Sequence, residues 1–402
     1  MQAALGFIRG PGRAVVVLSL TQILGWGILI YPPVLTMPHV AAAHGWSLTF
    51  GMAGFSLALV VSGLLSPSVG GLIDRHGGNW VMGTGALAGA AGMLLLAHAE
   101  QRWSYLASWV LIGVAMASTL YDPAFTTLAR LFGTSARRQI TFVTFAGGFA
   151  STVGWPATQL LLQEIGWRDT YLVFAAVLAL VIAPLHAFAL PRARHVPPPP
   201  PAAHASPPPP AALLKPEGWL FAVMVAGFAV YAFILSGVTS NLLALLQRGG
   251  LSAAEAVSVG AMFGPAQVVA RLADFVLAGR TNPLWIARGA VALMASAFAL
   301  LVLVGISFPV AAAFSIAFGA ANGVMTIARG ALPLMLFGAI GYGRVMGRMA
   351  RPALFVQASA PFVVALAVER LSDHAVLELA VLGTVAALGC FWAIRPPSSI
   401  KH

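Results

Sequence analysis

The stretch Gly70-Gly71-Leu72-Ile73-Asp74-Arg75-His76-Gly77-Gly78-Asn79 decides how this sequence folds. It separates two almost uncharged runs, residues 47–69 and 80–97, each about long enough to cross a bilayer. Glycines allow a sharp turn, and a carboxylate at a helix boundary can accept hydrogen bonds from the exposed N–H groups of a neighbouring helix. The pattern therefore predicts a tight, charged loop between two transmembrane helices.

Composition assigns the whole chain to the membrane. Of its 402 residues, 59% are hydrophobic and 8% are charged, with a mean hydropathy of +0.89, which leaves too little polar surface for a soluble globule. Small residues such as the pair in Gly85-x-x-x-Gly89 favour close helix packing in lipid. The only cysteine, Cys390, excludes an internal disulfide or a thiolate cluster within one chain, and we expect no metal or cofactor.

The sequence predicts an all-α integral membrane protein with twelve transmembrane helices. Basic residues Arg9 and Arg13 precede an apolar run too long for a signal-peptide core, so we expect a retained first span. The predicted spans run over about 14–37, 47–73, 80–98, 103–130, 140–162, 170–190, 219–246, 253–278, 284–305, 309–337, 352–368 and 375–394.

Basic residues predict the orientation. With both termini placed in the cytoplasm of a bacterial inner membrane, sixteen of the 22 lysines and arginines fall on the inner side and four on the outer side. This strong asymmetry is the positive-inside signal. The basic residues form no stripe or aromatic-interleaved patch, so a nucleic-acid partner is not expected.

The chain divides into two similar halves. Residues 191–216 contain two proline runs and predict a cytoplasmic linker between an N-terminal six-helix bundle, residues 1–190, and a C-terminal one, residues 217–402. The segment Gly71-Leu72-Ile73-Asp74 has a counterpart 200 positions later, Arg271-Leu272-Ala273-Asp274. Two related bundles that rock about a central site would have this pseudo-symmetry.

The spacing Gly70-x-x-x-Asp74-Arg75-x-Gly77 resembles the loop between helices 2 and 3 of the major facilitator superfamily of secondary transporters, although Gly78 and Asn79 replace its final basic pair. The resemblance implies alternating access and a gating latch on the cytoplasmic side, made by Gly70, Asp74, Arg75 and Gly77. Two further segments, Gly166-Trp167-Arg168 and Leu120-Tyr121-Asp122-Pro123, look like bacterial exporters grouped with arsenical efflux carriers.

Asp122 and Arg329 are charges inside predicted spans. Charged groups at mid-bilayer cost at least about 2.5 kcal/mol, so they usually face a cavity or a partner. Counted from the ends of their helices, both residues lie near the midplane. The resemblance implies that helices 4 and 10, which carry them, line a central cavity. We expect Asp122 to carry the proton and Arg329 to be its partner or to bind an anion.

Each of these charges has a structural alternative. The order Tyr121-Asp122-Pro123 also suits a helix N-cap at a proline kink. Arg329 could bond backbone carbonyls without taking part in transport. Other polar and aromatic residues on the lining helices could either complete the pocket or hold helices together: Gln22, Trp26, Tyr31, Tyr121, Tyr231 and Asn241.

Arg271 and Asp274 lie three positions apart near the inner end of the eighth helix. This spacing suits a local ion pair, which we expect to support a second latch. Monocarboxylate carriers of the superfamily have an acid followed by an arginine on this helix, and here the order is reversed.

These observations favour a proton-linked secondary transporter, acting as a monomer, that exports a small organic solute or metalloid species. The alternative is proton-coupled uptake of a small monocarboxylate, with Arg329 holding the anion. An enzyme is not expected, because the sequence offers no nucleophile and base at a shared depth. No phosphate-binding Gly-x-x-x-x-Gly-Lys-Ser/Thr loop supports nucleotide-driven pumping.

Overall fold

The computed structural model describes residues 12–192, 217–276 and 281–395, and these residues are helical with no strands. The helices are α2 (Gly12–Leu29), α3 (Pro32–His44), α4 (Leu48–His76), α5 (Gly78–Ala97), α6 (Arg102–Thr119), α7 (Tyr121–Phe132), η1 (Gly133–Ser135), α8 (Ala136–Gly147), α9 (Ala150–Val177), η2 (Leu178–Ile182), η3 (Leu185–Ala189), α10 (Trp219–Arg248), α11 (Ala253–Val276), α12 (Pro283–Val304), α13 (Phe308–Phe337), α14 (Tyr342–Arg370) and α15 (Asp373–Ala393). The predicted all-α class is confirmed.

Among the described residues, ten helical stretches are long and apolar enough to cross a membrane. One of them, Ala136–Ala189, has 54 residues and bends at Gly166, whose φ of 78° and ψ of 173° are not helical. The 29-residue helix α14 is not among the ten, and its first half carries Arg344, Arg348 and Arg351. The protein is a multi-pass membrane protein.

Several predicted spans differ from the observed helices, including the fifth, 140–162, which is interrupted at residues 148–149 between α8 and α9. The first, 14–37, is broken after Leu29, before the pair Pro32-Pro33. The fourth, 103–130, is broken at Leu120, whose backbone is extended. The eleventh was expected to begin at residue 352, but α14 begins ten residues earlier because its arginines lie on helical turns and not in a loop. Most of the predicted linker, 193–216, lies outside the described residues.

Glycines set the closest helix contacts. A Cβ atom built on Gly89 would lie 2.7 Å from the Cβ of Ala115, and one on Gly92 would lie 2.9 Å from the Ser108 carbonyl oxygen. Gly85 packs even more closely on Ser118. The predicted Gly85-x-x-x-Gly89 pair therefore brings α5 against α6.

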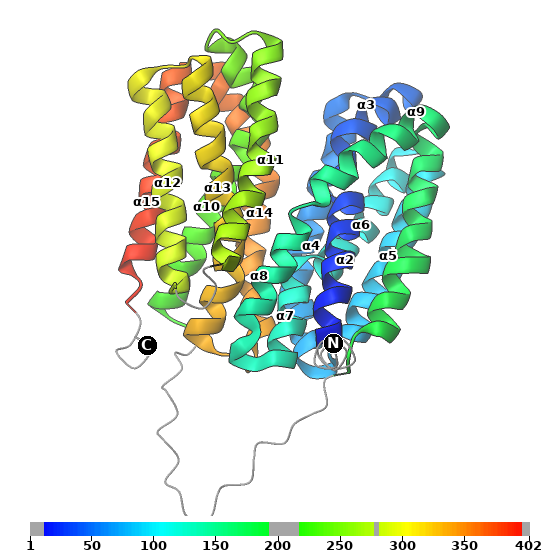
Figure 1. Ribbon diagram of the computed structural model, residues 1–402. Coiled ribbons are helices and arrows are strands. Elements are labelled where there is room, and N and C mark those ends of the chain that lie inside the picture. The colour runs from blue at the N-terminus through cyan, green and yellow to red at the C-terminus, as the bar shows by residue number, and fades with distance from the viewer. Residues whose placement is uncertain (1–11, 193–216, 277–280, 396–402) are drawn as a thin grey trace, which may run out of the picture.

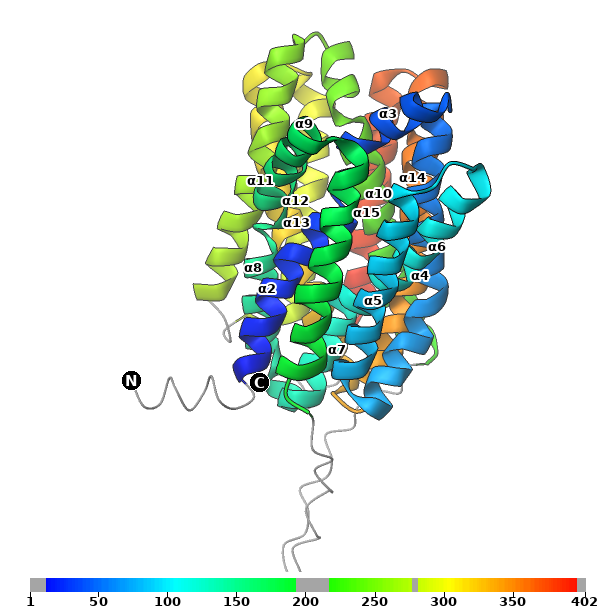
Figure 2. The same cartoon turned by 90° about the vertical axis from the view of Figure 1, so that its right-hand side faces the viewer.

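The helices gather on two sides of the molecule. In Figure 1, α10 to α15 lie on one side and α2 to α9 on the other, and the two sides diverge toward the end that carries α3. They meet where α14 packs on α4 and α7, and where α11 and α13 pack on α8. Figures 1 and 2 both place the start of α2 and the end of α15 at the end where the two sides meet.

Candidate functional site

The centre of the molecule contains an ion pair between the two sides. Arg329 of α13 donates from Nη2 to Oδ2 of Asp122, at 2.9 Å, and both side chains are mostly buried. The other carboxylate oxygen, Oδ1, is buried and accepts no hydrogen bond from the described residues. One acceptor on Asp122 is therefore open to a proton or a water molecule.

The break between α6 and α7 positions this carboxylate. Leu120 is the N-cap of α7 and makes no side-chain cap, so Asp122 lies inside the first turn and does not cap the helix. The capping alternative is wrong, because the helix begins at Tyr121, two residues earlier than a proline at its first position would suggest. The break frees the Thr119 carbonyl, which accepts a hydrogen bond of 2.7 Å from Nε2 of Gln22 on α2.

Aromatic rings cover the break from the side of α2. The Trp26 indole donates to Oε1 of Gln22 at 3.2 Å, and its ring lies 4.8 Å from that of Tyr121. The structure thus brings Gln22, Trp26 and Tyr121 together beside Asp122.

Arg271 lies in a second polar cluster, where α11 meets α13 and α8. Its side chain is 5% exposed. The guanidinium donates to the carbonyl oxygens of Gly323, at 3.3 Å, and Thr144, at 3.1 Å. It also donates to side-chain oxygens of Gln267, at 3.2 Å, and Thr326, at 3.4 Å. All four acceptors are neutral.

The expected ion pair between Arg271 and Asp274 is absent from the described residues. Each donor of Arg271 named above points to α8, to α13 or to Gln267, one turn earlier on α11. Asp274 faces Arg137 of α8 instead, and its Oδ2 is buried without a hydrogen bond from the described residues. The structure thus places Arg271 in the centre, away from the latch to which its spacing had assigned it.

Three tyrosines surround the Arg271 guanidinium closely enough to interact with it electrostatically: Tyr31, Tyr121 and Tyr231. The Tyr231 hydroxyl donates to Oδ1 of Asn322 at 3.3 Å, and Nδ2 of Asn322 donates to Oε1 of Gln267 at 3.0 Å. This chain of contacts connects α10, α13 and α11.

Sequence reasoning missed Gln267, Asn322 and Thr326, although a signal was present. Gln267 is four positions before Arg271, and Asn322 and Thr326 are seven and three positions before Arg329. These intervals place polar groups on one face of each helix. A polar stripe inside an apolar span therefore marks the faces of α11 and α13 that meet.

Two adjacent glycines at the end of α8, its last residue Gly147 and its C-cap Gly148, make space for this cluster. A Cβ atom on Gly148 would lie 2.6 Å from Nη1 of Arg271, and one on Gly147 would collide with the Tyr121 hydroxyl. Any larger side chain at these positions would displace the guanidinium or the ring.

Asn241 and the ring of Tyr31 lie apart from the ion pair. Asn241 donates to the carbonyls of Gly237, at 2.8 Å, and Pro361, at 3.4 Å, so it joins α10 to α14. Tyr31 follows the break after α2, and its ring meets that of Trp155 edge-on at 5.6 Å.

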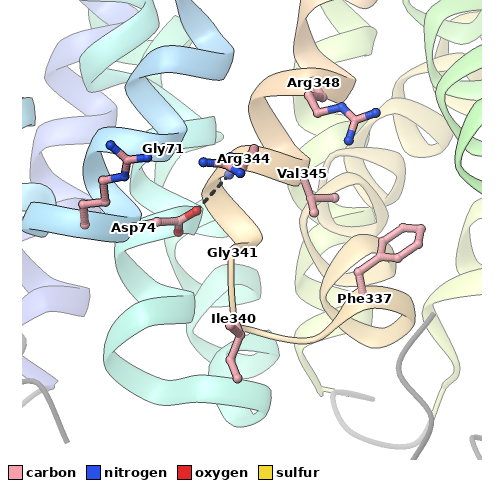
Figure 3. A pocket seen from close by; sticks show the side chains of 9 residues that line it. Gly71, Asp74, Phe337, Ile340, Gly341, Arg344, Val345 and Arg348 are labelled. Atoms are coloured by element: carbon pink, nitrogen blue, oxygen red, sulfur yellow. Dashed lines mark hydrogen bonds between the residues drawn. The ribbon is translucent and has the colours of Figure 1, made fainter. Parts of the chain in front are cut away.

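The glycine-rich stretch from Gly70 to Asn79 forms a contact between the two sides. The two carboxylate oxygens of Asp74 accept hydrogen bonds of 2.9 Å from the backbone N–H groups of Gly343 and Arg344, at the start of α14. Figure 3 shows the bond to Arg344. A carboxylate at a helix N-terminus is favoured by the helix dipole. Arg130 donates to the carbonyls of Ile73 and Asp74, which holds the end of α4.

Glycine also makes this contact possible. A Cβ atom on Gly70 would overlap the Gly343 carbonyl, and one on Gly343 would lie 2.8 Å from Oδ1 of Asp74. Gly77 has a φ of 87°, which glycine favours, and separates α4 from α5. We call the Asp74 contact with Gly343 and Arg344 the latch.

Comparisons with known proteins agree with this architecture. The family model described as Major Facilitator Superfamily matches residues 15–350. The chain therefore belongs to the major facilitator superfamily, whose members are transporters and not enzymes.

Individual relatives are more distant. Human monocarboxylate transporter 11 is 33% identical over 148 residues, which are 36% of this chain and 30% of that protein. The fold resembles those of the human organic anion transporter MFSD10 (TETRAN), with a TM-score of 0.70 at 18% identity over 95% of this chain and 99% of that one, and of the proton:xylose symporter XylE, with a TM-score of 0.74 at 13% identity over 96% and 97%. At these identities the two structures show the fold alone.

Proposed function

We propose that this chain is a secondary transporter of small organic anions, with Arg271 as the anion-binding group. The observation that supports this most is a buried guanidinium with only neutral acceptors. Removing a charged group from water costs several kcal/mol, which neutral hydrogen bonds offset only in part. A carboxylate that replaced some of these acceptors would supply the missing opposite charge and could bind in bidentate geometry.

Arg329 is less suited to this role, because Asp122 already neutralises it. Of the three central charges, Asp122, Arg271 and Arg329, one is negative and two are positive, so the site carries a net charge of +1. This charge matches a monocarboxylate. The similarity to a monocarboxylate transporter and the fold shared with an organic anion transporter support the same class of substrate.

This assignment favours the second function considered from sequence, proton-coupled uptake of a small monocarboxylate. Efflux of a neutral solute or metalloid would leave the charge of Arg271 without a role.

The ion pair suggests how a proton could accompany the anion. Protonation of Asp122 would neutralise the carboxylate and release Arg329. An anion at Arg271 and a proton at Asp122 would then cross together without net charge, which avoids moving an isolated charge through the bilayer.

The ion pair is also connected to the latch. Tyr342, the residue before Gly343, donates to the Gly330 carbonyl at 2.7 Å, next to Arg329. A cavity of about 10 Å³, the size of a single water molecule, is lined by both Asp122 and Gly343. A change at the ion pair could therefore alter the start of α14, where the latch is made.

We further infer twelve crossings in two six-helix bundles, residues 1–190 and 217–402, joined by the linker. The count adds a second crossing within Ala136–Ala189 and the crossing by α14 to the ten apolar stretches. The distribution of positive residues favours cytoplasmic termini. The expected location is a bacterial inner membrane. We expect the monomer to be active.

Equilibrium binding tests the proposal. Small monocarboxylates and neutral sugars would be titrated into the purified protein while tryptophan fluorescence is recorded, because Trp26 packs on Tyr121 beside the site. We expect at least one carboxylate to bind, and Arg271→Gln to weaken its binding about 30-fold or more, as for loss of one partner from a buried charge pair. Arg288→Gln, which removes an arginine elsewhere on the same side, is the matched control.

Arg271→Lys should keep part of the affinity, because the charge remains while the bidentate geometry is lost. Equal carboxylate affinity in wild type and Arg271→Gln would refute the proposal.

A further inference from the structure

A cavity of about 330 Å³ lies beside the latch and is not used by the proposed transport mechanism (Figure 3). Its size is within the range of small-molecule sites. Its lining comes from the end of α4, the end of α13, the segment that joins α13 to α14 and the start of α14: Gly71, Asp74, Arg75, Phe337, Ile340, Gly341, Arg344, Val345 and Arg348. The cavity therefore spans both sides of the molecule.

The lining has an excess of positive charge. Arg75, Arg344 and Arg348 contribute three positive charges and Asp74 one negative charge, so the sum is +2. The carboxylate oxygens of Asp74 already accept the two N–H groups of the latch. Guanidinium groups recognise carboxylates and phosphates, and a phosphate monoester, with about −1.5 to −2 charges near pH 7, matches this sum.

Apolar side chains adjoin these cations. Phe337 and Val345 line the same cavity, and Ile340 is 91% exposed at its edge. In Figure 3 the side chain of Ile340 points away from the arginines, while Arg344 and Arg348 lie at the opposite side of the cavity. A ligand with a phosphate head and an apolar neighbour would contact both parts of this lining.

We propose that this cavity binds a phosphate monoester, either as the headgroup of an acidic lipid or as a soluble organic phosphate. Because the lining belongs to both α4 and the start of α14, a bound phosphate would favour the conformation in which the latch is made. This site is separate from Arg271, and its test does not depend on the transported substrate.

Isothermal titration of the full-length protein in detergent tests this site. The probes are dihexanoyl phosphatidic acid, dihexanoyl phosphatidylcholine and glycerol 1-phosphate. We expect a phosphate monoester to bind at least tenfold more tightly than phosphatidylcholine. Comparable binding of glycerol 1-phosphate would indicate a soluble ligand, and binding of phosphatidic acid alone would indicate a lipid headgroup.

Variants assign the binding to the cavity. Arg75→Gln combined with Arg344→Gln should weaken binding at least tenfold, whereas Arg370→Gln, at the other end of α14, should not change it. The pair Arg75→Lys and Arg344→Lys keeps the charge and should stay within about tenfold of wild type. The proposal is overturned if no monoester binds, if all three probes bind alike, or if the glutamine pair binds as wild type does.

Discussion

Gly148 shows how a residue without a side chain can determine where a charged group lies. It is the C-cap of α8, and the Arg271 guanidinium occupies the space that its Cβ would fill. The adjacent Thr144 carbonyl, one turn earlier, accepts a hydrogen bond from the same guanidinium. Arg271 belongs to α11, on one side of the molecule, and Gly148 belongs to the other side. The position of the Arg271 guanidinium between the two sides therefore depends on Gly148.

Gly148→Ala should displace the guanidinium and weaken carboxylate binding. Overpacking of this kind costs about 1–3 kcal/mol, so the loss of affinity should be about fivefold or more. Gly264→Ala on α11 is the control, because its Cβ would meet no atom within 4 Å. Fluorescence titration of both variants measures the effect, and equal affinities would show that the guanidinium does not need this space.

At the residue scale, the sequence identifies charges more readily than their partners. Asp122, Arg271 and Arg329 are evident as charges in apolar runs. Spacing along one helix suggested Asp274 as the partner of Arg271. In the structure, however, Arg271 donates to the carbonyl of Thr144, which is 127 positions away. The rotation of α11 against α8 decides between these partners, and no local pattern records it.

At the scale of elements, the crossing of α4 and α14 joins the two sides. Gly70 and Gly343 let the backbones touch, and Asp74 accepts two N–H groups at the helix start. The sequence predicted the turn from its glycines and aspartate. The sequence could not identify α14 as the helix whose N–H groups bond to Asp74. The arginines of α14 indicated a loop where the structure has a helix.

Asp74→Ala should weaken the latch, which holds the two sides together at the end where they meet. It leaves the N–H groups of Gly343 and Arg344 without their acceptor, which costs about 1–3 kcal/mol. The equilibrium between the conformation in which the latch is made and the one in which it is broken should shift by about 5- to 150-fold toward the broken one. Spin labels at Ser135 and Ile340, in a Cys390→Ser background, report the separation of the two sides.

Asp373→Ala is the matched control for this variant. Asp373 also begins a helix, but it pairs with Arg248 on the same side of the molecule, at 2.9 Å. The distance distribution of the labels should broaden toward longer values for Asp74→Ala and not for Asp373→Ala. Identical distributions in both variants would mean that the latch does not hold the sides together.

At the scale of the whole molecule, composition and loop charges were enough to predict a multi-pass helical membrane protein, and the loop motif was enough to predict its family. The polar network between the two sides could not be predicted, because it depends on how α8, α11 and α13 rotate against one another. The helix break at Leu120 was also hidden inside a continuous apolar run, whereas the bend at Gly166 falls between two predicted spans, 140–162 and 170–190.

The most direct test of the account is simultaneous measurement of anion and proton flux in proteoliposomes, using a radiolabelled monocarboxylate that binds and an interior pH dye. An inward carboxylate gradient should carry protons inward with the wild-type protein. Arg271→Gln should abolish both fluxes, and Asp122→Asn should abolish proton movement. Carboxylate flux that persists in Arg271→Gln, or proton flux that persists in Asp122→Asn, would contradict the account.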